Sequence, residues 1–259
     1  MFPVAHGWLL AQVKGEPSLA EYLGCVWPDM LFGSPLTHPQ SHKSGAKLLA
    51  FARGLPSGPE RDEFTAFARG VLTHGSEPHG FDWFSDEAYG ADGADGARAR
   101  GYAFQRGAPL ATRAAAACGL PEGQGLWKAH NLIEMAFERW CFEANPLAAR
   151  RLATACADTD LMARIAAPLA SFFDADRTAL ADSMRRYAEV VTLTPTSLDA
   201  LGQTYALQTR IKHTNAQPSA SAIADLIGEA EELVAHERDE YLGVCHTGVR
   251  VTLAGATAD

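Results

Sequence analysis

Apolar residues recur at helical spacing along almost the whole chain, and this pattern restricts the fold more than any other feature. The clearest example is the segment 60–74, where Phe64, Phe67, Val71 and His74 fall on one face of a helix. The strict alternation of apolar and polar residues that is typical of half-buried strands is almost absent. A chain of 259 residues with 47% apolar content can bury a large core. We therefore predict an all-α fold.

The same spacing, together with proline and glycine punctuation, places the other elements. We expect helices at 17–26, 41–54, 60–74, 109–118, 121–145, 146–157, 160–173, 176–191, 195–213 and 219–242. Segments 31–40 and 77–101 are predicted to be loops, the second being acidic and containing the repeat GADGADGA. A long loop inside a compact domain is usually functional or disordered, and we expect this one to form part of a pocket wall. The tail 247–259 is predicted to form a short strand around 249–253 or to fray.

Composition excludes several classes of protein. The formal net charge of −9 argues against a dedicated nucleic-acid binder, because the chain repels polyanions. No apolar run approaches the roughly 20 residues that a membrane helix needs, so we expect no transmembrane segment. The first 15 residues lack the basic start of a secretory signal, and the five cysteines contain no C-x-x-C pair. We expect reduced cysteines and a cytoplasmic location.

Histidines are concentrated in the first half of the chain. Six of the nine lie there, namely His6, His38, His42, His74, His79 and His130. His130 and Glu134 are four residues apart on a predicted helix, so their side chains lie on one face and could converge on one ion. Imidazole nitrogen and carboxylate oxygen together suit zinc. Such pairs are also common on exposed helix faces. The interpretation as a metal site is favoured here because the other histidines lie at predicted helix ends and turns. We interpret His213 and His236, which lie in polar surroundings, as surface histidines.

Three segments in a fixed order resemble a known family. They are the run from Leu23 to Asp29 (LGCVWPD), the run from Ala68 to His74 (ARGVLTH) and the motif His130-x-x-x-Glu134. Together they resemble the zinc-dependent phospholipase C family of helical bacterial hydrolases, over about residues 5–143. The resemblance implies a multi-helix bundle of that type, here with additional C-terminal helices. It also implies a cluster of two or more Zn²⁺ ions between helices and hydrolysis of phosphoesters.

The resemblance also implies a set of metal ligands, carried over by position. These are Asp29, His42, His74, His79, His130 and Glu134. His38 is the second choice for the position given to His42, and His6 could match an early histidine of the family.

The chain departs from the family at Pro78, where the family has an aspartate one turn after the helical histidine. Glu77 or Asp82 could take its place from a different backbone position. A carboxylate beside an activated water can act as general base, and Asp29, Glu77 and Asp82 are the candidates.

Two hypotheses follow from these observations. The first is a zinc-dependent hydrolase of a small phosphoester, since other catalytic motifs such as H-E-x-x-H, G-x-S-x-G and the P-loop are absent. The second is a non-catalytic helical protein of the same ancestry that binds one metal ion or none, as a metal-binding or scaffold protein. In either case we divide the chain into a helical metal-binding core at 1–145, a C-terminal helical segment at 146–246 packed on it, and the tail at 247–259. The sequence indicates neither the substrate nor the oligomeric state.

Overall fold

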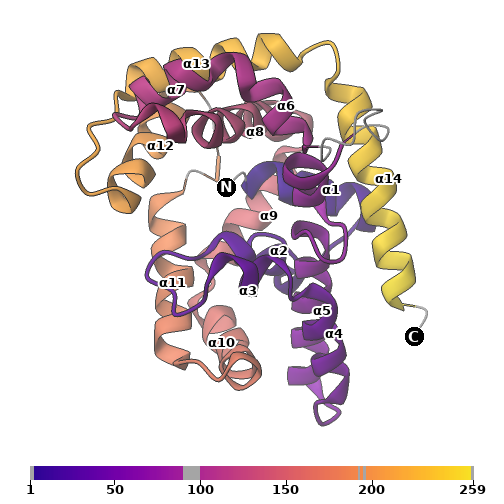
Figure 1. Cartoon of the computed structure of the whole chain (residues 1–259). Coiled ribbons are helices and arrows are strands. Elements are labelled where there is room, and N and C mark those ends of the chain that lie inside the picture. Colours follow the sequence, from indigo (N-terminus) through magenta and orange to yellow (C-terminus); the bar gives the residue numbers. More distant parts are fainter. Residues whose placement is uncertain (1–2, 90–99, 192, 195–196, 258–259) are drawn as a thin grey trace.

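The protein is built from α-helices joined by short connections, as the computed structural model shows (Figure 1). The structure describes residues 3–89, 100–191, 193–194 and 197–257, and within these ranges there is no β-strand. The all-α prediction is therefore confirmed. No helix in the described ranges is both long enough and apolar enough to cross a membrane.

The chain forms fourteen labelled α-helices and four short 3₁₀ or π segments over the described residues. The first half contains α1 (Pro3–Lys14), α2 (Leu19–Gly24), η1 (Trp27–Asp29), α3 (His38–His42), α4 (Gly45–Gly54), α5 (Pro59–His74), η2 (Trp83–Glu87), α6 (Tyr102–Gly107), η3 (Ala108–Leu110), α7 (Ala111–Ala117), η4 (Glu122–Gln124) and α8 (Gly125–Ala144). The second half contains α9 (Pro146–Ala157), α10 (Thr159–Phe173), α11 (Arg177–Val190), α12 (Leu198–Lys212), α13 (Ala220–Val234) and α14 (Arg238–Thr257).

Helix α8 lies at the centre of one end of the molecule, where it packs against α6, α7 and α13 (Figure 1). Helix α1 packs against α8, α9 and α14 and so connects this end to the other. The opposite end contains α4 with α5 and α10 with α11 as two neighbouring pairs. The C-terminal helices thus pack on the N-terminal ones, and a single apolar core extends from Val4 to Leu253.

Several helices begin at a polar residue whose side chain caps the first turn. Ser18 caps α2 by accepting a hydrogen bond from the Glu21 amide, while the Glu21 carboxylate accepts one from the Ser18 amide. Asp158 and Asp176 cap α10 and α11 in the same way, by accepting from the amides three residues further on. These caps explain why α10 and α11 begin within one residue of the predicted starts at 160 and 176.

Helices α2 and α5 approach each other closely at two glycines. A Cβ atom on Gly70 would lie 2.1 Å from the carbonyl oxygen of Glu21, and a Cβ atom on Gly24 would lie 2.1 Å from that of Phe67. Only glycine allows this backbone contact. The contact brings the end of α2 beside the last turn of α5, which carries His74.

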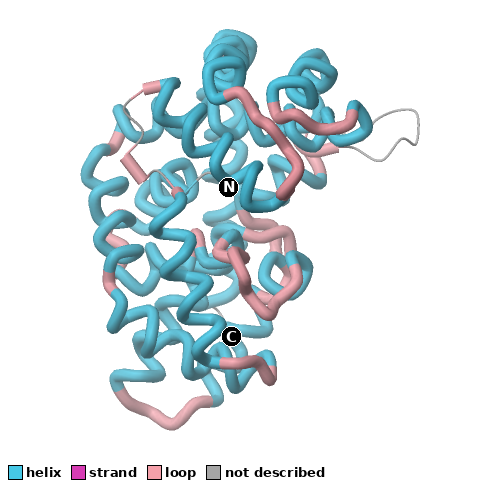
Figure 2. Tube along the Cα trace, turned by 90° about the vertical axis from the view of Figure 1, so that its left-hand side faces the viewer, coloured by secondary structure: helices cyan, strands magenta, loops and turns pink. Residues whose placement is uncertain are grey.

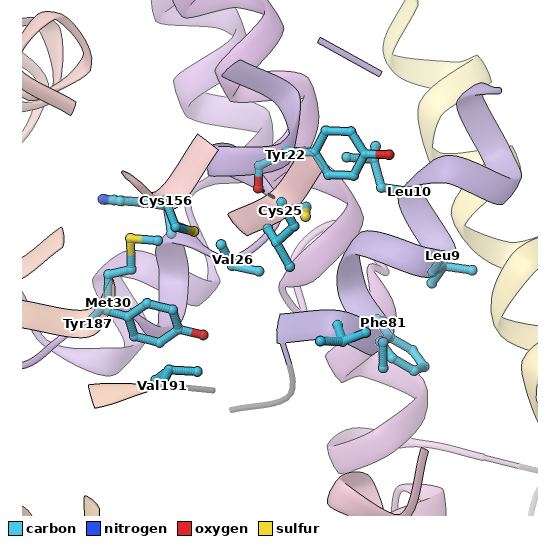
Figure 3. Close-up of a cluster of buried hydrophobic side chains, with 14 of the residues drawn as sticks. Leu9, Leu10, Tyr22, Cys25, Val26, Met30, Phe81, Cys156, Tyr187 and Val191 are labelled. Carbon is cyan, nitrogen blue, oxygen red and sulfur yellow. Dashed lines mark hydrogen bonds between the residues drawn. The ribbon is translucent and has the colours of Figure 1, made fainter. Parts of the chain in front are cut away.

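Figure 3 shows the apolar cluster behind this contact, with Cys25 and Val26 beside Met30 and Tyr187. All five cysteines are buried and free, as expected from the sequence. The core therefore surrounds the segment from which the site is built.

Three local predictions need correction. The tail forms no strand, because Leu242, Cys245, Val249 and Leu253 recur at helical spacing and bury one face of α14, which is continuous from Arg238 to Thr257. The segment 77–101 is not wholly a loop, since η2 is helical; its GADGADGA stretch lies outside the described residues. The loop predicted at 31–40 is confirmed for 31–37, and only its last three residues belong to the short helix α3. Most of the chain outside the turns is helical (Figure 2).

Candidate metal centre

His74 ends α5 and is fully buried. Its Nδ1 atom lies 2.7 Å from the carbonyl oxygen of Cys25, at the end of α2. Because a carbonyl can only accept, Nδ1 carries the proton and donates it, and the lone pair of a neutral imidazole is then on Nε2. The close contact of α2 and α5 thus fixes both the position and the tautomer of this histidine.

The same arrangement occurs at two other histidines. Nδ1 of His130 donates to the carbonyl oxygen of Trp127 at 2.8 Å. Nδ1 of His42 lies 3.1 Å from the carbonyl oxygen of His38 and 2.8 Å from the Ser41 hydroxyl. A hydrogen bond from the second ring nitrogen to a backbone carbonyl is characteristic of histidines that bind metal through Nε2.

Asp82 faces three histidine rings. Its Oδ2 lies 3.1 Å from Nε2 of His74 and 3.5 Å from Nε2 of His42. Its Oδ1 lies 3.4 Å from Nε2 of His6, a buried residue of α1. Asp29, at the end of η1, lies 3.6 Å from Nε2 of His42, because α3 packs against η1. These five residues form what we call the Asp82 cluster.

A second group lies one helical turn further along the same segment, at Asp86. Nε2 of His130 is 3.3 Å from Oδ1 of Asp86 and 3.5 Å from Oε2 of Glu134. The hydroxyl of the buried Ser85 donates to Oε1 of Glu134. Asp82 and Asp86 are four residues apart, so one helical segment supplies a carboxylate to each group. We call Asp86, His130 and Glu134 the Glu134 group.

The distances in both sets suit ligands arranged around ions better than direct ion pairs. Charge-assisted hydrogen bonds between nitrogen and carboxylate oxygen are usually about 2.7–2.9 Å long. Two ligand atoms bound to one tetrahedral zinc ion, each about 2.0–2.2 Å from it, lie about 3.4 Å apart. The six nitrogen to oxygen distances here fall between 3.1 and 3.6 Å.

The donor atoms form three combinations in which every ligand atom lies within 4.8 Å of the others. They are His6 with His74 and Asp82, Asp29 with His42 and His74, and Asp86 with His130 and Glu134. With both rings neutral, the buried Nε2 of His74 faces an acceptor, Oδ2 of Asp82 at 3.1 Å, and the buried Oδ1 of Asp86 faces Nε2 of His130 at 3.3 Å, so no hydrogen bond forms at either atom. Buried polar atoms without partners are costly, and a bound cation would satisfy both. These buried histidine and acidic residues could therefore hold metal ions.

The pKa shifts of the acidic and histidine side chains in the protein without metal are consistent with a site for cations. Burial raises the pKa of Asp82, but the neighbouring His74 and His6 outweigh it and hold that pKa well below the usual range. Burial lowers the pKa of His74, but Asp82 and Asp29 raise it above 6.5 overall. Burial and the nearby charge of Asp86 raise the pKa of Glu134 well above its usual range. Four carboxylates in one small region repel one another, and two divalent cations would balance their charge.

A cavity of about 310 Å³ opens beside both sets of donors. Asp29, His42 and Asp82 line it from the Asp82 cluster, and the whole Glu134 group lines it as well. The donors are thus accessible to a small molecule.

A buried carboxylate holds α1 in place. Glu138, one turn after Glu134 on α8, accepts hydrogen bonds from the amides of Val4 at 3.1 Å and Ala5 at 2.8 Å. These amides are in the first turn of α1, where helix donors lack partners. Glu138 therefore anchors the helix that carries His6.

The structure brings most of the sequence candidates together, namely Asp29, His42, His74, Asp82, His130 and Glu134, with His6. Glu77 and His79 are both exposed and lie outside these groups. The Glu77 carboxylate pairs with Lys43 at 3.1 Å, and the His79 ring stacks on Trp83 with 3.8 Å between ring centroids. His38 is exposed and stacks on the His42 ring, so it supports that ring from outside the groups.

Two contributions were missed by sequence reasoning. Asp86 and Ser85 lie in the segment expected to be a loop, where the spacing from Asp82 to Asp86 was the available sign of a shared helix face. His213, interpreted as a surface residue, lines the cavity and lies 3.3 Å from Nζ of Lys128.

Searches of protein-family models, curated proteins and solved structures with this chain found no match.

Proposed function

We propose that this protein is a zinc-dependent hydrolase of small phosphoesters, with a helical bundle of the zinc-dependent phospholipase C type. The observation that carries the proposal is that two sets of imidazole and carboxylate donors lie side by side and open on one cavity. Mixed imidazole and carboxylate donors without thiolate suit zinc among the common metals.

The Asp82 cluster and the Glu134 group would hold the ions. Asp82 would be the central ligand, because Oδ1 faces His6 and Oδ2 faces His74. When bound, zinc ions polarise a phosphoryl oxygen and lower the pKa of a water molecule toward neutrality. Asp86 and Glu134 with His130 would complete the neighbouring position on the cavity wall.

The protein residues then have separate tasks. In the neutral rings, the hydrogen bonds from Nδ1 of His74 and His130 select the tautomer whose lone pair is on Nε2 and orient that atom toward the carboxylates. Asp29 and Asp82 both line the cavity and are placed to accept a proton from an attacking water, whereas the exposed Glu77 does not line it. Of the three general-base candidates, the geometry supports the two aspartates.

Hydrolysis by zinc-loaded protein tests the proposal. Bis-p-nitrophenyl phosphate and p-nitrophenyl phosphate are mixed with protein reconstituted with zinc, and release of nitrophenolate is followed by absorbance. We expect hydrolysis that disappears on removal of zinc and returns on its addition. A His236→Ala variant serves as control, because His236 is exposed and belongs to none of the groups that could hold a metal.

The non-catalytic alternative predicts a different result. A metal-binding or scaffold protein would retain zinc and hydrolyse neither ester at any zinc concentration. Zinc content measured on the same samples distinguishes this outcome from failure to load the metal.

A further inference from the structure

Basic residues also line the cavity beside the metal groups. They are Lys128 of α8 with Lys212 and His213 at the end of α12, which we call the cationic wall, and the carboxylates of both donor sets line the same cavity. The chain has a net charge of −9, so this group of basic residues is opposite in sign to the protein as a whole. Helix α12 lies outside the part of the chain that resembles the phospholipase C family.

Lys128 is buried without a counter-charge. Only 4% of the residue is exposed. Its Nζ lies 3.3 Å from Nε2 of His213 and 5.8 Å from the ring centroid of Tyr205. Within the described residues it forms no ion pair with a carboxylate. A buried cation that lacks a paired anion is costly, and such groups are usually paired.

Other polar atoms on this wall are also unsatisfied. Gln208 of α12 is 3% exposed, and its amide oxygen is buried without a hydrogen-bond partner. The Tyr205 hydroxyl, one helical turn before Thr209, is likewise buried and unpartnered. Tyr205 and Gln208 both line the cavity. A ligand that enters this cavity would meet hydrogen-bonding groups as well as charge.

We propose that Lys128, with Lys212, His213 and Gln208, forms a subsite for a second anionic group of the substrate. The substrate is thus a phosphoester that carries a further carboxylate or phosphate, with the scissile phosphate on the metal side and the second anion on the lysine side. This inference rests on the proposed function for the scissile group only, because no residue of the cationic wall belongs to the groups that could hold a metal. A substrate with a cationic head would be disfavoured by the same wall.

The experiment uses four p-nitrophenyl phosphodiesters that share one leaving group. Their second alcohol is ethanol, choline, glycolic acid or 2-phosphoethanol, so the second group is neutral, cationic, a carboxylate or a phosphate. KM is measured with zinc-loaded protein, and binding of each ester is measured separately by calorimetry. We expect the two anionic esters to have KM values roughly tenfold below that of the ethyl ester, as a hydrogen bond to a charged group predicts. The choline ester should have the highest KM, and the better of the two anionic esters identifies the second group.

The variant Lys128→Met removes the charge and retains a side chain of similar length. It should abolish the preference for the anionic esters, so that their KM values approach that of the ethyl ester. Lys47→Met is the matched control, since Lys47 is exposed on α4 and does not line the cavity, and it should keep the wild-type ranking.

The two proposals fail in different ways. Equal KM values for all four esters in the wild-type protein, or an anionic preference that survives Lys128→Met, would overturn the subsite and leave the hydrolase intact. Absence of hydrolysis with a ranking of affinities retained in calorimetry would overturn the hydrolase and leave the subsite. The ranking of the four esters is measured on the wild-type protein. It therefore tests the subsite even if the Lys128→Met variant does not fold.

Discussion

Oδ2 of Asp82 lies 3.1 Å from Nε2 of His74, although the two residues belong to separate helical segments. The connecting turn folds back on itself, and the amide of Gly80 donates to the carbonyl oxygen of Gly75 at 2.8 Å. The turn also contacts α3, where the amide of Ser76 donates to the carbonyl oxygen of His42 at 3.0 Å. One short connection therefore places the aspartate against both histidines.

Asp82→Asn should lower the zinc content by removing tight binding at the Asp82 cluster, and it should abolish hydrolysis. The amide keeps the size of the side chain but provides one neutral oxygen where the carboxylate provides two charged ones. Zinc content and ester hydrolysis measure the effect. Glu77→Gln is the matched control, because Glu77 is an exposed carboxylate paired with Lys43, and it should retain both properties. A result in which Glu77→Gln loses zinc and Asp82→Asn keeps it would reverse our placement of the bridging carboxylate.

Gly70→Ala should destabilise the protein by about 1–3 kcal/mol, as is usual for overpacking. The added Cβ would lie 2.1 Å from the carbonyl oxygen of Glu21 and push α2 away from α5. Thermal unfolding measures the loss, and a zinc titration should show weaker binding, because the carbonyl that orients His74 moves with α2. Gly54→Ala is the control: its Cβ meets no atom within 4 Å. Equal unfolding temperatures for the two variants would argue against a tight backbone contact.

Stability without metal should fall as the pH rises above 6.5. The pKa of His74 is raised above 6.5 in the folded protein, so its protonated form stabilises the fold at low pH, and this contribution is lost as the pH passes the raised pKa. Burial also raises the pKa of Glu138, against its hydrogen bonds from Ala5 and Val4, to about 8, and its loss of a proton acts in the same direction. His6, whose pKa is lowered to about 4 chiefly by burial, acts in the opposite direction, but its contribution is complete once the pH has passed the unfolded value of 6.5.

Zinc should reverse this dependence, because metal ions bind unprotonated histidine and carboxylate. Unfolding temperatures between pH 6.5 and 9, with and without zinc, measure both trends. The stabilisation by zinc should grow with pH. A zinc effect that shrinks as the pH rises over this range would contradict the assignment of these groups as ligands.

His130→Ala should lower the zinc content while leaving the helical content unchanged. The substitution removes the central donor of the Glu134 group, and alanine favours the helix. Elemental analysis and circular dichroism measure the two properties. His79→Ala provides the contrast, since His79 is exposed and outside the groups that could hold a metal, and should keep the full zinc content. Equal zinc content in wild type and His130→Ala would remove His130 from the site.

The sequence predicts most of the helices because their period and caps are local, although α1 was missed and the helix predicted at 219–242 is divided between α13 and α14. Spacing alone places Phe64, Phe67 and Val71 on the buried face of α5, and His74 follows from the same period. The tail was different: Val249, Val251 and Leu253 alternate as a strand would, but Val251 is exposed and Val249 is buried on a helix. Tertiary packing against the core, which the local pattern does not contain, decides that case.

The site could be predicted only in part, for a related reason. His130 and Glu134 are neighbours on one helix, so their spacing reveals them. Asp82 and Glu77 were equal candidates in the sequence, because the turn that directs Asp82 inward depends on contacts with His42. Lys128 gave no sign of its role, since its counterparts on α12 are about eighty residues away in the chain.

Elemental analysis of zinc, on protein purified without a metal-affinity tag or chelators and then reconstituted with zinc, tests the central claim most directly. The paired donor sets predict two or more zinc ions per chain, with fewer in Asp82→Asn. A chain that retains no zinc after reconstitution would contradict the metal centre and the hydrolase proposed from it.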